Sequence, residues 1–299
     1  FWKGESMKKI GEAVSYGAAT IINAIATGKG AAFGVDLWAK ARVELRNETG
    51  EVEVKIRNDP KENTGLAIKV FNKVLDHFDL KNEYGAKIET WSNIPIARGL
   101  KSSSVAANAI ALATVSALNR KDEIDDLTLL NLSVDAAIDA KVTITGAFDD
   151  ACASYFGGVV ITDNLKREIV KRYSLKNESL CIVFLVPYKK VYTGKLNVKK
   201  LKLISRIVDI AYEEALRGNI WDALTLNGLL YSSALDYDYS IALDALDSGA
   251  IAAGLCGKGP SFTAVIEEEF VKKLMKAWKN RKGKIIKARI NNKKAQSIW

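Results

Sequence analysis

The stretch that decides the fold is Asn93–Leu118, which reads NIPIARGLKSSS over 93–104 and VAANAIALATVSAL over 105–118. Its first half is predicted to be a loop, because Pro95 fixes one φ angle and Gly99 permits a turn that a Cβ atom hinders. Three consecutive serines then offer N-cap oxygens at the start of a helix. From Val105 onward nearly every residue is apolar, so this helix is predicted to be buried on most faces.

A glycine loop that opens into a buried helix directs free N–H groups and the positive end of the helix dipole to one point, which suits a phosphate. Lys101 and the three serine hydroxyl groups add donors, and Ser103 is the candidate magnesium ligand. The candidate phosphate-binding loop comprises Pro95, Ile96, Ala97, Arg98, Gly99, Leu100, Lys101, Ser102, Ser103, Ser104 and Val105. The alternative is a capped core helix that binds nothing. A Walker A loop is excluded, because Gly-x-x-x-x-Gly-Lys-Ser/Thr does not occur.

Size, net charge and histidine content limit which kinds of domain, partner and catalytic mechanism the chain can have. With 299 residues, of which 48% are hydrophobic, the chain can bury a substantial core in one large or two ordinary domains. The net charge of +9 favours anionic partners such as nucleotides, carboxylated metabolites or nucleic acid. The single histidine, His77, is predicted to be a surface or core-edge side chain, which excludes Ser-His-Asp and Cys-His mechanisms.

Cysteine usage and hydropathy indicate a cytoplasmic protein. Cys152, Cys181 and Cys256 are widely spaced and odd in number, so neither a disulfide framework nor a zinc cluster is predicted, and a reducing cytoplasm fits best. No apolar run is long enough to predict a membrane span, and no secretory leader precedes the first predicted strand. Residues 1–6 read as a cloning leftover, with Met7 the natural start.

The first third of the chain shows strand patterns on either side of one helix pattern. Apolar and polar residues alternate over 35–45 and again over 52–56, and the turn residues 47–50 predict that these strands form a hairpin. Over 60–80 the apolar residues recur three and four positions apart, which predicts an amphipathic helix covering the sheet. A third strand at 86–91 leads into the phosphate-binding loop.

Further strands and helices follow in both halves of the chain. Asp125 or Asp126 can cap a helix that runs through Ile138, and short strands are predicted at 142–145 and 159–162. Past a predicted linker at 174–179, we expect strands at 180–186, 249–255, 262–266 and 284–290, and helices at 201–217, 220–235, 239–248 and 270–278. This mixture, with antiparallel hairpins in both halves, predicts two α+β domains instead of a doubly wound parallel sheet.

Three glycine-bearing segments, 17–37, 93–105 and 254–261, lie far apart, with an aspartate pair at 149–150. The middle segment resembles the Pro-x-x-x-Gly-Leu-x-Ser-Ser motif of the GHMP kinase superfamily, and 254–261 resembles that superfamily's C-terminal glycine motif. The run AFDDACASYFGG resembles the superfamily segment in which an aspartate precedes a short helix and a Gly-Gly pair. Lys101 and Ser104 depart from the motif, because most members carry Gly or Ala at those positions.

Segment 17–37 resembles more specifically the archaeal-type shikimate kinases, and this resemblance covers the chain from Met7 onward. It implies a two-domain GHMP kinase fold, with an N-terminal ribosomal-protein-like βαβ domain at 7–173 and a C-terminal ferredoxin-like domain at 174–299. The implied activity is the transfer of the γ-phosphoryl group of ATP, with Mg²⁺, to the 3-hydroxyl of shikimate. The product, shikimate 3-phosphate, leads to chorismate and the aromatic amino acids.

The resemblance also implies roles for single residues. Asp149 is the best match to the family aspartate, which accepts or orients the proton of the attacking hydroxyl. Counting back from Gly157 in different members selects either Asp149 or Asp150, and both could instead be N-cap residues of the following helix. Gly257 and Gly259 belong to the ATP site, and Lys258 between them stands where a small residue is expected.

The substrate site is less sharply defined by the sequence. A shikimate carboxylate needs a cation, for which Lys29 and Arg98 are the candidates, although either could be a solvent-facing charge. Asn23 is a candidate for binding substrate hydroxyl groups, whereas Asp36 is more simply explained as the polar side of its strand.

Two other functions remain open at this point. Within the superfamily, the substrate could instead be homoserine or a mevalonate-pathway alcohol. From another class, the basic charge and the implied βαβ domain allow an RNA-binding module. Against RNA binding, the basic residues are not interleaved with aromatic residues in a clear stripe, and three glycine loops have no evident use there.

Overall fold

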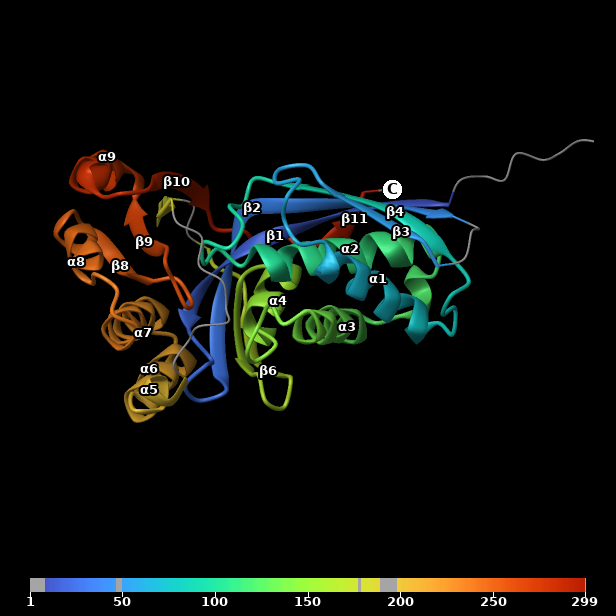
Figure 1. Ribbon diagram of the computed structural model, residues 1–299. Helices are drawn as coiled ribbons and strands as arrows, with labels where there is room; N and C mark the ends of the chain where they lie inside the picture. The colour runs from blue at the N-terminus through green and yellow to red at the C-terminus, as the bar shows by residue number, and fades with distance from the viewer. Residues whose placement is uncertain (1–8, 47–49, 177–178, 189–197, 299) are drawn as a thin grey trace, which may run out of the picture.

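The computed structural model describes residues 9–46, 50–176, 179–188 and 198–298. Figure 1 shows an elongated molecule in which a long sheet with helices α1 to α4 on one face adjoins a smaller sheet with its own helices. The predicted leftover at 1–6, most of the predicted turn at 47–50 and part of the predicted linker at 174–179 lie outside the described residues.

The larger sheet is built around one long strand. β2 is long enough to pair along its second half with β4 and along its first half with β5, while β1 runs antiparallel beside it. The strand order is β11-β1-β2-β4-β3, with β5 also on β2 and β6 on β5. The strands are β1 Ile10–Ile22, β2 Lys29–Arg46, β3 Val52–Ile56, β4 Gly85–Ser92, β5 Val159–Asp163, β6 Glu168–Tyr173 and β11 Gln296–Ser297.

The predicted hairpin between β2 and β3 was wrong. β4 lies between them, antiparallel to β2 and parallel to β3, with Val52 opposite Ala86 and Ile56 opposite Thr90. Parallel neighbours need a crossover connection, and the predicted amphipathic helix, α1 Gly65–His77, supplies it. Alternation of side chains specifies which face of a strand is buried, but it does not specify the pairing partner.

Four helices cover one face of this sheet (Figure 1): α1, α2 Ser102–Leu118, α3 Asp126–Asp139 and α4 Phe148–Phe156. The predicted burial of α2 is confirmed, and its small side chains let β1 approach closely: a Cβ atom on Gly11 would lie 2.1 Å from the Ala113 carbonyl oxygen. Asp125 caps α3 as predicted, because its carboxylate accepts the N–H groups of Leu127 and Thr128.

Two local predictions in this half were wrong. The three serines do not cap α2; they form its first turn, and the N-cap is Lys101, whose φ of 61° places its backbone in the left-handed region. Residues 142–145 form a loop instead of a strand. Their β-branched residues favour a strand, but none of the strands in the described ranges pairs with them, and they line a cavity.

The smaller sheet is antiparallel and has the order β10-β7-β9-β8. Its strands are β7 Leu180–Val186, β8 Ala250–Leu255, β9 Phe262–Glu267 and β10 Lys284–Arg289. Its helices are α5 Val198–Lys202, α6 Ser205–Arg217, α7 Ile220–Ala234, α8 Ser240–Asp247 and α9 Val271–Ala277. The single helix predicted over 201–217 is interrupted at residues 203–204, where the N–H groups of Leu203 and Ile204 bond three residues back.

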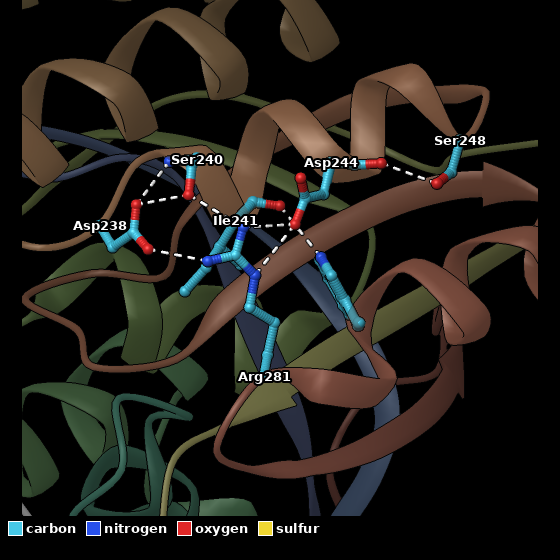
Figure 2. Close-up of polar contacts among 7 residues, drawn as sticks. Asp238, Ser240, Ile241, Asp244, Ser248 and Arg281 are labelled. Carbon is cyan, nitrogen blue, oxygen red and sulfur yellow. Dashed lines mark hydrogen bonds and ion pairs between the residues drawn. The ribbon is translucent and has the colours of Figure 1, made fainter.

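Arg281 ties α8 to the segment that follows α9 (Figure 2). Its guanidinium donates to Asp238 at 2.8 Å, to Ser240 at 2.9 Å and to Asp244 at 3.0 Å, and Asp238 in turn accepts the Ser240 N–H at the start of α8. Just before this network, the Tyr237 ring packs on Gly259, where an added Cβ atom would lie 2.7 Å from it. The network therefore supports the glycine loop at 256–261.

The two sheets meet where Val35 on β2 forms a bridge with Ile290, just past β10, and the loop at 256–261 contacts the phosphate-binding loop. A Cβ atom on Gly99 would lie 2.8 Å from the Gly259 carbonyl oxygen, so glycine is required there by contact as well as by its φ of 86°. A hydrogen bond connects the end of β1 to α7: the backbone N–H of Asn23 donates to the Asn227 side-chain oxygen at 3.1 Å. No helix among the described residues combines the length and the apolar character that crossing a membrane requires.

Candidate active site

A cavity of about 430 Å³ lies at this junction. Its walls come from the phosphate-binding loop and the start of α2, the N-terminus of α4, the loop at 140–145, the end of β1, and Lys258 of the 256–261 loop. Its lining combines apolar side chains, such as Ile56, Leu66 and Trp91, with the polar side chains of Asn23, Asp149 and Asp150. The size and this mixed lining are typical of a small-molecule site.

The phosphate-binding loop turns its backbone into the cavity. Ala97, Gly99 and Lys101 all have positive φ angles, of 55°, 86° and 61°, and such turns gather successive N–H groups into an anion-binding concavity. Seven of the predicted loop residues line the cavity: Ile96, Ala97, Gly99, Lys101, Ser102, Ser103 and Ser104. Four do not. Leu100 and Val105 are buried in the core, Pro95 lies outside the wall, and Arg98 donates to the Pro187 carbonyl.

Lys101 and Asp150 form a buried ion pair beside this loop. Lys101 Nζ lies 2.8 Å from Asp150 Oδ2, and the two side chains are only 12% and 7% exposed. The second carboxylate oxygen of Asp150, Oδ1, is buried and has no hydrogen-bond partner in the part of the chain that the structure describes. The two aspartates do not cap α4, because the N-cap is Ala147 and both lie inside the first turn, where the helix dipole favours negative charge.

Contacts with Asn164 and Gly30 position the Asp149 carboxylate. Its Oδ1 accepts a hydrogen bond of 2.8 Å from Asn164 Nδ2, and its carboxylate lies against Gly30, where an added Cβ atom would be 2.7 Å from Oδ2. Burial, followed by the charge of Asp150, raises the pKa of Asp149 to about 7, against the opposing effects of Lys101 and the Asn164 hydrogen bond. A carboxyl group that titrates near neutral pH suits proton transfer.

The third glycine segment lies over Lys101. A Cβ atom on Gly257 would be 2.4 Å from Lys101 Nζ, so Gly257 lets the loop cross the ammonium group, while Gly259 packs on Gly99. Neither glycine lines the cavity, but Lys258 between them does. Burial, and then repulsion from Lys101, lowers the pKa of Lys258 to about 8. An anion that enters the cavity therefore meets two neighbouring lysines.

Only one of the two predicted substrate residues, Asn23 and Lys29, lines the cavity. Asn23 lines the cavity, and its side-chain oxygen accepts the Ile25 N–H at 3.0 Å. Lys29 does not line it, because its ammonium group pairs with Asp209 at 2.9 Å on a half-exposed surface. Two further features have no motif that reveals them in the sequence. One is Asn164, which donates to Asp149. The other is the apolar part of the cavity lining, Ile56, Leu66 and Trp91, whose residues come from separate strands and helices.

Comparison with known proteins agrees with this geometry. Residues 65–158 match the model of the GHMP kinases N terminal domain. The chain is 45% identical to a shikimate kinase of Methanosarcina mazei, covering 96% of this chain and 97% of the relative. It is 44% identical to that of Methanothrix thermoacetophila, with 96% of each covered.

A crystal structure of homoserine kinase from Cytophaga hutchinsonii has the same fold, with a TM-score of 0.70, 17% identity and full coverage of both chains. The predicted α+β fold of the GHMP kinases is thereby confirmed, while homoserine kinase itself is only a distant structural neighbour. On the sequence match over nearly its whole length, this chain belongs to the GHMP kinase family, in its shikimate kinase branch.

Proposed function

We propose that this protein transfers the γ-phosphoryl group of ATP to the 3-hydroxyl group of shikimate, giving shikimate 3-phosphate and ADP. The observation that carries the proposal is the buried Lys101–Asp150 pair, which lies directly beside the phosphate-binding loop and inside the same cavity. Phosphoryl transfer depends mainly on positioning and on charge stabilisation, and this arrangement offers both.

We place the nucleobase of ATP against the apolar lining residues Ile56, Leu66 and Trp91. The N–H groups of Gly99 to Ser104 would then bind the polyphosphate. Gly257 and Gly259 act indirectly, by holding the third loop against Lys101 and Gly99. With this placement, the γ-phosphate lies near Lys101.

Mg²⁺ fits as a companion of the nucleotide. It usually takes most of its ligands from phosphate oxygens and water, with one or two from the protein. Ser103 is in the first turn of α2 and lines the cavity, so its hydroxyl oxygen is the ligand that we assign to the protein. The ion would supply charge stabilisation at the transferred phosphoryl group.

Asp149 and Asp150 have different roles in our proposal. Asp150 lines the cavity and pairs with Lys101, and its Oδ1 has no hydrogen-bond partner among the described residues. Asp150 is therefore the better placed to accept a hydrogen bond from the acceptor hydroxyl. Asp149 lies behind it and holds a proton near neutral pH. The sequence match favours Asp149 for the hydroxyl contact, whereas the geometry favours Asp150.

Lys258 is our candidate for the shikimate carboxylate. Lys258 lines the cavity, whereas Lys29 and Arg98 do not: Lys29 pairs with Asp209, and Arg98 donates to the Pro187 carbonyl. Asn23 stays in the proposal as a contact for the substrate hydroxyl groups. A carboxylate beside Lys258 would offset the repulsion between Lys258 and Lys101.

The proposal is tested by measuring ADP release with shikimate, homoserine and mevalonate as acceptors, followed by NMR of the product. We expect turnover with shikimate alone and phosphate on its 3-oxygen. Turnover with homoserine instead would overturn the substrate assignment. RNA retention that is sensitive to salt, together with no ATP turnover, would favour the nucleic-acid alternative.

Two broader proposals accompany this one. We place the enzyme in the cytoplasm, which is consistent with the three cysteines being unpaired thiols. We also divide the chain into domains at 7–173 and 174–299. In support, residues 10–173 supply six strands of the larger sheet and 180–289 the whole smaller sheet, although β11 returns from the C-terminus to pair with β1.

A further inference from the structure

Behind Asp149 lies a short chain of buried polar groups that no motif marks. Thr162 is on β5, Asn164 follows the end of that strand, and both are fully or nearly fully buried. Thr162 Oγ1 lies 2.7 Å from Asn164 Oδ1, and Asn164 Nδ2 lies 2.8 Å from Asp149 Oδ1. Thr162 Oγ1 also lies 3.2 Å from the carbonyl oxygen of Gly30 on β2.

The chemistry of this chain permits two complete hydrogen-bond patterns. A threonine hydroxyl has one proton, so it can donate either to Asn164 Oδ1 or to the carbonyl oxygen of Gly30. When it donates to Gly30, its oxygen can also accept from the Asn164 amide N–H. The oxygen and nitrogen of an asparagine side chain occupy nearly the same space, so half a turn of the amide exchanges donor and acceptor without moving other atoms.

We propose that the Asn164 amide reverses its orientation with the protonation state of Asp149. When Asp149 is charged, Asn164 donates to it and the Thr162 hydroxyl donates to Asn164. When Asp149 carries a proton, that proton is donated to Asn164 Oδ1, Asn164 Nδ2 donates to Thr162, and the Thr162 hydroxyl donates to Gly30. The side-chain polar groups of Thr162, Asn164 and Asp149 therefore each keep a hydrogen-bond partner in both states.

This inference rests on the proposed function for its use in catalysis: Asp149 can hold or release a proton while the carboxylate stays in place. The other titratable groups that act on Asp149 are Lys101 ahead of α2, Asp150 and Cys152 on α4, and Tyr231 on α7. Asn164 is therefore a positioning residue. Its distinguishing property is that it supports both forms of Asp149, whereas a fixed donor supports only the charged form.

Replacing Asn164 by the nearly isosteric leucine separates the two models. A fixed donor stabilises only the carboxylate, so its loss should raise the pKa of Asp149 by about one to two. A reversing amide stabilises both forms, so Asn164→Leu should leave that pKa within about half a unit of the wild-type value while lowering kcat. The readout is a ¹³C NMR titration of the Asp149 carboxyl group, assigned from its loss in Asp149→Asn.

The matched positive control is Asp150→Asn, which should lower the pKa of Asp149 and so prove that the titration detects a change. A rise of one or more in Asn164→Leu would overturn the inference. If this variant does not fold, neutron diffraction from deuterated wild-type crystals can determine the orientation of the Asn164 amide, because it distinguishes the ND₂ group from oxygen. We expect ND₂ to face Asp149 at pH 8.5 and Thr162 at pH 5.5; ND₂ facing Asp149 at both pH values refutes the proposal.

Both measurements are made without substrate. A failure of shikimate turnover would therefore refute the proposed function and leave this inference standing, and a fixed amide would refute only the inference.

Discussion

Replacing Asp150 by asparagine removes one negative charge from the centre of the site and keeps the size of the side chain. Lys101, 2.8 Å away and 12% exposed, would then be a buried cation without its main partner. Breaking a buried pair in this way costs about 3–5 kcal/mol of folding stability. We expect the net loss to be smaller here, because Asp149 also interacts with Lys101 and can take over part of the pairing.

The same substitution should change the titration of its neighbour. The charge of Asp150 helps to raise the pKa of Asp149 to about 7, so that pKa should fall in Asp150→Asn. The acceptor hydroxyl would meet a neutral amide, which is a far weaker proton acceptor than a carboxylate. The kcat should therefore drop by about 10²–10⁴-fold, the usual contribution of a positioned acid or base. The KM for ATP should change little, because the loop amides are untouched.

The assay is ADP release at saturating shikimate between pH 6 and pH 9, run in parallel for Asp150→Asn and Asp149→Asn. Urea unfolding of both variants reports whether either loss of activity is a loss of folded protein. Near-normal turnover in Asp150→Asn, with activity abolished in Asp149→Asn, would refute our division of roles and return the hydroxyl contact to Asp149.

Three further results follow from the geometry of the site. Because the pKa of Asp149 in the folded protein, about 7, lies above its ordinary value of 3.8, the folded state binds a proton that the unfolded chain releases. The free energy of unfolding should therefore fall as the pH rises from about 4 to about 7, by about 4 kcal/mol at most, and Asp149→Asn should flatten that slope in urea titrations. Lys258→Met should raise the KM for shikimate at least about tenfold, the effect of losing about 1.4 kcal/mol of binding free energy. Lys29→Met removes a half-exposed surface ion pair and should leave that KM unchanged. Equal effects of the two substitutions in steady-state kinetics would contradict our choice of cation. Gly30→Ala should lower kcat at least about tenfold by displacing the Asp149 carboxylate. The control Gly50→Ala strains a backbone with a φ of 94° but meets no described atom within 4 Å, so its kcat should stay unchanged. The idea fails if both variants turn over like the wild type.

The sequence predicts best where one local signal dominates. The apolar run from Val105 to Leu118 predicts a buried helix because no amphipathic alternative exists for it, and the structure buries α2 as expected. The alternation at 35–45 and the continuous apolar run of β7 were equally informative, because each pattern fits only one kind of burial.

Predictions failed where the outcome depends on distant residues. β3 pairs with β4 because the crossover through α1 brings them together, and nothing within 52–56 specifies that partner. Lys101 takes the N-cap position ahead of three serines, since its ammonium group is held by Asp150, far along the chain. Lys29 does not line the cavity, because it pairs with Asp209 on α6, which is far away in the sequence.

Asn164 illustrates the same limit within the site. Its importance arises from contacts with Asp149 and Thr162 that form only when α4 and β5 are assembled, and its neighbours in the sequence form no recognisable motif. By contrast, the aspartate pair and the glycine loops could be found because chemistry requires those residue types close together in the sequence.

The central claim is that the backbone N–H groups ahead of α2 hold the phosphates of ATP. A crystal structure with a non-hydrolysable ATP analogue and shikimate tests it most directly. We predict the β- and γ-phosphate oxygens within hydrogen-bond distance of the N–H groups between Gly99 and Ser104, and the shikimate 3-hydroxyl beside Asp150. Phosphates bound elsewhere, with this loop left unliganded, would contradict the account.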